Sequence, residues 1–126
     1  HIEQGVFGDE FIRRARESCD IAINIHNEAY PSFENRVSMH MAAGHLVISE
    51  PLSPSHGLEP GIDFLEVRTP GELQDAVSRV RRQPESVDLT RWRGRQKAES
   101  FRASTVWARV LHDLLADVSV FGGRPR

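Results

Sequence analysis

The residues best suited to chemistry lie in one stretch of this chain, "NRVSMHMAAGHLVIS", residues 35–49. Its pattern predicts a short helix, a turn at Gly44 and a buried strand over 46–49. Asn35 and Arg36 then fall in the first turn of the helix, where unpaired backbone N–H groups and the helix dipole favour an anion. Arg36 can add a two-point guanidinium contact to a phosphate. Helix geometry alone also allows an ordinary helix with an exposed arginine.

Three apolar runs, at 20–25, 46–49 and 63–67, alternate with stretches of helical period. This alternation predicts an α/β domain with a Rossmann-like parallel sheet flanked by helices on both faces. The first run is so apolar that it predicts an inner strand covered on both faces. Helices are expected over residues 9–19, 33–43, 70–83, 86–101 and 104–118.

Local signals support three of these helices. Thr69 and Glu72 form a capping-box pattern around Pro70, which suits a first helical position. Apolar residues then recur at helical spacing in the first, third and last helices. These stripes are Phe11, Ile12, Ala15 and Cys19; Leu73, Ala76, Val77 and Val80; and Trp107, Val110, Leu111, Leu114 and Val118.

The carboxyl ends of the predicted strands are the expected place for a ligand in such a fold. Three segments lie there: the loop at residues 26–34, the proline- and glycine-bearing loop at 49–61, and the turn after Val67. The second loop is long for a compact domain, and loops of that length are often functional.

Composition excludes several classes of protein. The 126 residues carry a net charge of -2, which gives no electrostatic footprint for nucleic acid. The single cysteine, Cys19, excludes an internal disulfide, fits a reducing, cytoplasmic compartment and is expected in the core. No apolar run is long enough to predict a membrane span. We expect one domain over residues 1–118 and a flexible tail over 119–126.

Other common chemistries lack their motifs. His26, His40, His45 and His56 show no zinc spacing, so no metal is predicted. Ser49, Ser53 and Ser55 are not in a nucleophile elbow, and no glycine-rich phosphate loop is present. The basic run "TRWRGRQK" is better interpreted as a solvated helix face than as a nucleic-acid patch.

The motifs "DIAINIH", "NRVSMHMAAGHLVISE", "EPGIDFLEV" and "TPGEL", closed by "STVWARVLHDLL", follow one another in a specific order. In order and spacing they resemble the carboxyl-terminal half of GT-B glycosyltransferases. The branch most similar contains the spore-maturation-protein-like and group 1 glycosyltransferases. The similarity runs from about Gly8 to Leu115, although the individual motifs are loose.

The resemblance implies a truncated GT-B carboxyl-terminal domain that binds a nucleoside diphosphate sugar for metal-independent glycosyl transfer, without a cofactor. It also implies a missing amino-terminal acceptor domain, so the chain is expected to be inactive alone. The donor-binding residues that it suggests are His26, Asn27, Asn35, Arg36, Met39, His40, Gly44, Ser49, Glu50, Ser55, His56 and Gly57.

One position departs from the family pattern. Met39 stands where the family usually has a Glu that holds the ribose hydroxyls, and a thioether is only a weak acceptor. His40 or Glu34 is the expected substitute. The alternative hypothesis is a non-catalytic interaction or binding domain that retains only the half-fold.

Overall fold

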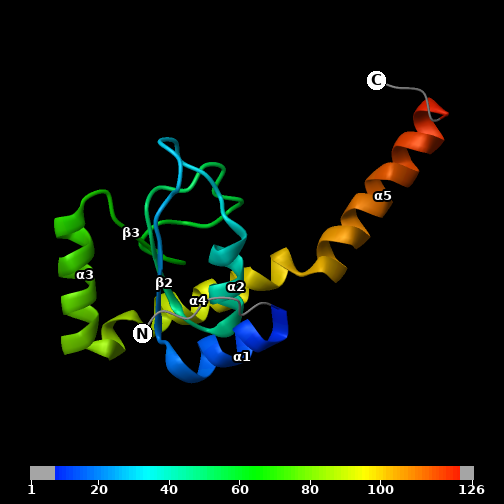
Figure 1. The fold of residues 1–126 in the computed structure, drawn as a ribbon. Coiled ribbons are helices and arrows are strands. Elements are labelled where there is room, and N and C mark those ends of the chain that lie inside the picture. The colour runs from blue at the N-terminus through cyan, green and yellow to red at the C-terminus, as the bar shows by residue number, and fades with distance from the viewer. Residues whose placement is uncertain (1–7, 123–126) are drawn as a thin grey trace.

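A computed structural model describes residues 8–122 and shows a three-stranded parallel sheet with helices on both faces (Figure 1). The elements are α1 (Gly8–Ser18), β1 (Ile21–Asn24), α2 (Asn35–Ala43), β2 (Leu46–Ser49), β3 (Leu65–Glu66), α3 (Pro70–Arg82), the 3-10 turn η1 (Pro84–Val87), α4 (Asp88–Ala98), the 3-10 turn η2 (Glu99–Phe101) and α5 (Ala103–Phe121). Strand β1 pairs with β2, and β2 pairs with β3, both in parallel register. The predicted α/β class and parallel strands are therefore confirmed.

Strand β2 is the centre of the sheet, and all four of its residues are buried. Because successive side chains of a strand point to opposite faces, β2 belongs to two cores. Val47 packs in the cluster that contains Val37 and Met41 of α2. Leu46 and Ile48 pack in the cluster that α3 covers.

Strand β1 lies at an edge of the sheet, not inside it as predicted. Ile23 and Ile25 are 48% and 54% exposed, while Ala22 and Asn24 on the opposite face are buried. The apolar run indicated burial on both faces, but only the face toward α2 is fully covered. On the other face, Ile21 is partly buried against the cluster that α3 covers. Within residues 8–122, no further strand pairs with the free edge of β1.

Helix α1 follows the predicted span, but its last predicted stripe residue is not in the core. Ala15 is buried, whereas Cys19, just past the end of the helix, is exposed. The side chains of Phe11 and Ile12 lie outside the part of the chain that the structure describes.

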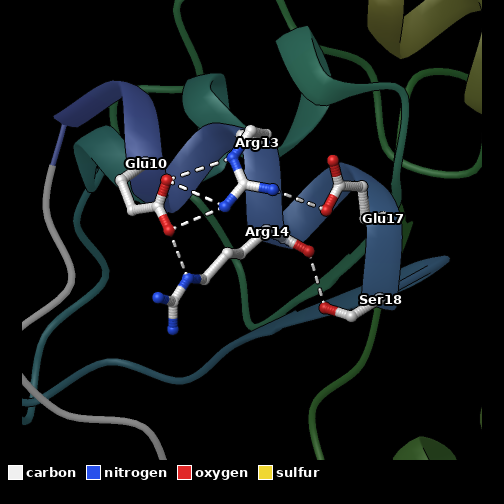
Figure 2. A network of polar contacts seen from close by, with 5 residues as sticks. All are labelled: Glu10, Arg13, Arg14, Glu17 and Ser18. Atoms are coloured by element: carbon white, nitrogen blue, oxygen red, sulfur yellow. Dashed lines mark hydrogen bonds and ion pairs between the residues drawn. The ribbon is translucent and has the colours of Figure 1, made fainter.

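The outer face of α1 carries a network of charged side chains (Figure 2). The Arg13 guanidinium donates to Glu10 and Glu17, Arg14 donates to Glu10, and the Ser18 hydroxyl donates to the Arg14 carbonyl. Hydrogen bonds from Arg13 and Arg14 lower the pKa of Glu10 to about 2. These pairs are exposed, so they add little stability and mark a solvated helix face.

Helix α3 begins where the sequence predicts, but the capping box is only half formed, because the Glu72 carboxylate accepts the backbone N–H of Arg68 and not that of Thr69. The Thr69 hydroxyl accepts the backbone N–H of Glu72 at 3.2 Å, and Pro70 occupies the first helical position. Ala76 and Val80 are buried against the sheet. The helix ends at Arg82, before Pro84. The region predicted as one helix over 86–101 is instead divided into η1, α4 and η2.

Helix α5 leaves the body of the molecule and continues past the predicted end of the domain (Figure 1). The boundary expected at residues 118–119 therefore falls within a helix that reaches Phe121. Residues 123–126 of the predicted tail lie outside the described residues, so its flexibility stays a prediction. No helix between residues 8 and 122 combines the length and apolarity that crossing a membrane requires.

Helix α4 crosses the molecule at a point where only glycine fits. A Cβ added at Gly94 would lie 2.6 Å from the backbone oxygen of Asp63 and 3.6 Å from Cγ of Met41. The Asp63 carboxylate is buried beside the same helix, and it accepts from Arg93 Nε at 3.3 Å and from the backbone N–H of Glu59 at 3.0 Å. This contact holds α4 against the loop that precedes β3.

We expect Gly94→Ala to destabilise the chain by about 1–3 kcal/mol, because the added methyl group must push backbone away. Urea unfolding followed by circular dichroism measures the change. Gly71→Ala in α3 is the matched control, since its Cβ would meet only Thr69 Oγ1 at 3.9 Å. That control should be neutral or more stable by up to about 1 kcal/mol through helix propensity. A Gly94→Ala protein as stable as the wild type would contradict the close approach.

Candidate functional site

The candidate site begins with a buried amide at the carboxyl end of β1. Asn24 is 3% exposed and stands opposite Ser49 of β2 in the sheet. Its Nδ2 donates to Ser49 Oγ at 2.9 Å, and the Ser49 hydroxyl donates to the Glu50 carbonyl at 2.7 Å. Its Oδ1 accepts from Arg36 Nε at 2.6 Å. The buried polar atoms of Asn24 and Ser49 therefore all have hydrogen-bond partners, as is usual for buried polar groups.

Arg36 brings the start of α2 to this strand end. Besides Asn24, its guanidinium donates to the Ile25 carbonyl at 2.6 Å and pairs with Glu34 at 2.6 Å. Glu34 is the N-cap residue of α2, but its side chain does not cap the helix. The first turn of α2 thus has no side-chain cap and points toward the carboxyl edge of the sheet, where the helix dipole favours negative charge.

His26 connects the strand end to two loops. Its Nε2 lies 2.8 Å from the Pro51 carbonyl, an arrangement in which Nε2 must be the protonated nitrogen. Its Nδ1 lies 3.3 Å from the Ser32 hydroxyl and 3.6 Å from the Glu34 carboxylate. The Glu50 carboxylate accepts the backbone N–H of His26 at 2.7 Å. Loops after β1 and β2 are therefore held to each other.

The loop after β2 reaches the start of α2 through aromatic contacts. The His56 ring meets Phe33 edge-on at 4.9 Å between centroids, and Phe33 stacks on Phe101 of η2 at 5.2 Å. Lys97 of α4 donates to the Gly57 carbonyl at 2.8 Å. The Ser55 carbonyl accepts the backbone N–H of Leu58 within the loop. The tip of this loop is thus packed next to the segment that enters α2.

A small crevice opens beside this network on the α3 side of the sheet. Its volume is about 220 Å³, and its lining includes Ile23, Ile25, Val67, Pro70 and Leu73. Ligand pockets usually measure about 300–1,000 Å³, so this crevice fits one flat or apolar group rather than a whole nucleotide sugar.

The predicted site residues fall into two groups. His26, Arg36, Ser49, Glu50, Ser55, His56 and Gly57 gather around the carboxyl edge of the sheet and the start of α2. Asn27 and Asn35 are exposed at the same edge, and Met39 is half-buried one turn into α2. His40 and Gly44 lie at the other end of α2, away from that edge.

Gly44 has a structural role at that far end. Its φ of 87° is the left-handed conformation that ends a helix, and its backbone N–H donates to the Met41 carbonyl. Arg91 of α4 donates to the Gly44 carbonyl at 3.2 and 3.3 Å, which places a cation at the negative end of the helix dipole. His40 lies in the last turn of α2 beside His45, whereas Glu34 lies at the carboxyl edge of the sheet, so Glu34 is the nearer of the two expected substitutes for the missing Glu.

His40 instead forms a pair with His45. Their Nδ1 atoms are 2.9 Å apart, so only one of the two can carry the shared proton. Burial lowers the pKa of His40, and the nearby charges of His45 and Arg36 lower it further. Burial likewise lowers the pKa of His45, partly offset by the Ala15 carbonyl. The folded state therefore favours the neutral pair.

Sequence reasoning missed Asn24 and Asp63. The signal for Asn24 was a polar side chain in an apolar strand, on the same face as Ala22 and at the carboxyl end of β1. Asp63 was the first residue of the predicted strand over 63–67, and nothing in its neighbours indicated that its carboxylate is buried. In the part of the chain that the structure describes, no group of three His, Cys, Asp or Glu side chains is arranged to hold a metal ion.

Comparisons with known proteins place the chain in no family. No family model matches it, and no solved structure matches it. A serine/arginine (SR)-type shuttling mRNA binding protein from Mycosarcoma maydis is 38% identical over 52 residues. That stretch covers 41% of this chain and only 9% of the relative, so the likeness is local.

The neutral histidine pair predicts a loss of stability in acid. The ordinary pKa of both histidines is 6.5, so below this pH the unfolded chain takes up protons more readily than the folded one. The stability that the folded state gains from keeping this pair neutral is fully present above about pH 6.5, and it is lost as the pH falls below that value. We expect the midpoint of thermal unfolding to drop between about pH 7.5 and pH 5.

His40→Gln should reduce this dependence, because it removes one titrating member of the pair. His112→Gln is the control, since the His112 side chain is 82% exposed on α5. Equal pH profiles for the wild type and His40→Gln would show that the pair does not govern acid stability.

Proposed function

We propose that this chain is the donor-binding domain of a GT-B glycosyltransferase. It holds a nucleoside diphosphate sugar at the carboxyl edge of its parallel sheet for metal-independent glycosyl transfer. The sequence resemblance suggests this family, and the parallel α/β arrangement is compatible with it.

The observation that carries the proposal is the position of the start of α2. This helix end has no side-chain cap and lies at the carboxyl ends of two parallel strands, where ligands of such folds bind. Its backbone N–H groups and Arg36 suit a diphosphate. Glu34 already places a carboxylate between Arg36 and His26, which indicates that this environment accepts an anion.

In the proposed complex, the diphosphate lies at Asn35 and Arg36 and displaces Glu34 from the guanidinium. Glu34 is then free to accept a ribose hydroxyl, which is the role that Met39 cannot fill. The loop at residues 49–57 covers the sugar. The transfer itself requires an acceptor domain, because catalysis depends on holding both reactants in attack geometry. The chain alone is expected to bind without turnover.

A non-catalytic binding or interaction domain is the second candidate. The observation that favours it is the internal satisfaction of Arg36, which already donates to Asn24 and to the Ile25 carbonyl. Together with Met39, this arrangement suits a half-fold that no longer binds a donor. The two candidates differ in one measurement, the affinity for a nucleoside diphosphate.

The mRNA binding named for the Mycosarcoma maydis relative does not fit the charges of this chain. The net charge is -2, whereas nucleic-acid binding depends on a basic surface. The basic side chains of α4 are paired internally: Arg93 with Asp63, Arg95 with Glu99, and Lys97 with Glu59 and Asp63.

Titration with UDP and GDP, followed by amide chemical shifts, tests the proposal. We expect shifts at Asn35, at Arg36 and across residues 49–57. Shifts confined to residues 86–118, or no shifts with either nucleotide, would count against a donor site at the start of α2.

Two substitutions should change nucleoside diphosphate affinity in opposite directions. Met39 and Asn35 lie about one turn apart on α2, so Met39→Glu places a carboxylate where a ribose can be bound. A charge-assisted hydrogen bond contributes roughly 1.5–3 kcal/mol, so affinity should rise about ten- to a hundredfold. Arg36→Ala should weaken binding. Isothermal calorimetry measures both effects.

Two controls separate these effects from changes in overall charge. Ala42→Glu adds the same charge to an exposed position near the far end of α2, and Arg81→Ala removes an exposed arginine from α3. Neither should alter affinity. If Ala42→Glu matches Met39→Glu, the gain is electrostatic and not a ribose contact.

A further inference from the structure

Helix α5 carries an apolar surface that nothing between residues 8 and 122 covers. Its larger apolar side chains are mostly half or more exposed: Trp107 62%, Val110 43%, Leu111 53%, Leu114 55%, Leu115 69% and Val118 48%. The helix packs chiefly on the short turn η2 at its start and then leaves the body (Figure 1). No residue of α5 is buried.

The spacing of these side chains identifies the kind of surface that fits them. Trp107, Leu111, Leu114 and Val118 follow one another at intervals of four, three and four residues. This is the a/d repeat by which one helix packs along another. Val110 and Leu115 flank the row on either side, so the stripe is wide. The natural complement is a second helix with the same repeat.

We propose that α5 pairs with α5 of a second copy of this chain, in antiparallel orientation, to form a homodimer. In that orientation Trp107 of each copy lies over Val118 of the other, and Leu111 lies over Leu114. Large side chains then meet small ones at the ends of the seam, and medium ones meet in its middle. In a parallel pair the two Trp107 rings would meet each other, and the two small Val118 side chains would leave a gap.

The exposed area is sufficient for such a dimer. By usual side-chain areas, the six residues expose roughly 700 Å² of surface in each copy. Both copies together would bury at most about 1,400 Å², within the range of about 1,200–2,000 Å² that specific interfaces bury. In an antiparallel pair, the positive end of each helix dipole also lies beside the negative end of the other, which is favourable. It keeps the two bodies at opposite ends of the helix pair.

The charges on α5 argue against a lipid surface as the occupant. Arg109, Asp113 and Asp117 give the helix a net negative charge, whereas helices that lie on membranes carry a basic polar face. The same charges do not repel a second copy within the seam, because Arg109, Asp113 and Asp117 do not lie at a or d positions.

Light scattering coupled to size-exclusion chromatography on the full chain tests the proposal. We expect the mass of a dimer at tens of micromolar, about the range where moderate interfaces assemble. Leu111→Glu should raise the dissociation constant at least about tenfold, because it places two carboxylates in the seam. Circular dichroism should show an unchanged fold, since Leu111 is 53% exposed within one copy.

Val120→Glu is the matched control. Val120 is 70% exposed on the same helix but lies on the face opposite the seam. It should leave the dimer intact. A monomeric wild type, or a dimer that resists Leu111→Glu, or equal dissociation by both variants would overturn the proposal. Wild-type monomers that co-sediment with lipid vesicles would assign the surface to a membrane and would overturn it equally.

Orientation is read from disulfide formation in a Cys19→Ser background. Leu111→Cys mixed with Leu114→Cys should cross-link efficiently, because these positions face each other in the antiparallel pair. Leu111→Cys alone should cross-link poorly. The reverse result would show a parallel dimer and would reject the proposed geometry.

Discussion

The buried amide of Asn24 is the interaction on which the candidate site depends. It bonds at once to Ser49 across the sheet and to Arg36 at the start of α2. An apolar residue at this position would remove one hydrogen bond from each partner, although Ser49 would still donate to the Glu50 carbonyl and Arg36 to the Ile25 carbonyl. A buried polar atom left unsatisfied by such a change costs about 1–3 kcal/mol. The same amide therefore stabilises the pairing of β1 with β2 and directs α2 toward the strand ends. A polar residue in an apolar strand is explained by that double contact.

The far side of the site is held by α4. Gly94 allows this helix to approach the Asp63 backbone, and the Asp63 carboxylate fixes the loop before β3 through Arg93 and the Glu59 amide. Arg91 of the same helix binds the last turn of α2 through the Gly44 carbonyl. Helix α4 thus contacts both the loop that faces the start of α2 and the end of α2 itself. A change at Gly94 is expected to disturb the site without touching it.

The sequence predicted the parts of the fold that follow local rules. The α3 cap at Thr69 and the turn at Gly44 depend on neighbours in the chain, and both are found in the structure. The three parallel strands are also found, because apolar runs alternating with helical stretches leave few other arrangements. The wrong predictions concern burial. The apolar run of β1 was expected inside the sheet but lies at its edge, and Cys19 was expected in the core but is exposed. For the site, the gathering of strand ends was predictable from the parallel topology. The roles of Asn24 and Asp63 were not, because hydrogen bonds over 12 to 30 residues leave no periodic pattern.

The two ends of α2 are held in different ways, which bears on the anion site proposed at its start. Nine residues are too few for a helix to be stable alone in water, so its orientation must come from tertiary contacts. At the carboxyl end, the Gly44 N–H donates to the Met41 carbonyl, and Arg91 donates to the Gly44 carbonyl. The contact between His40 and His45 also joins this end of the helix to the start of the next strand. At the amino end, Arg36 fixes the direction of the helix, while the first turn keeps no side-chain cap. Because the contacts at the carboxyl end and the Arg36 bonds hold the helix in place, its amino-terminal turn can remain ordered without a side-chain cap. A ligand that binds there loses little free energy to ordering the protein, which is the condition under which a small domain can bind an anion specifically.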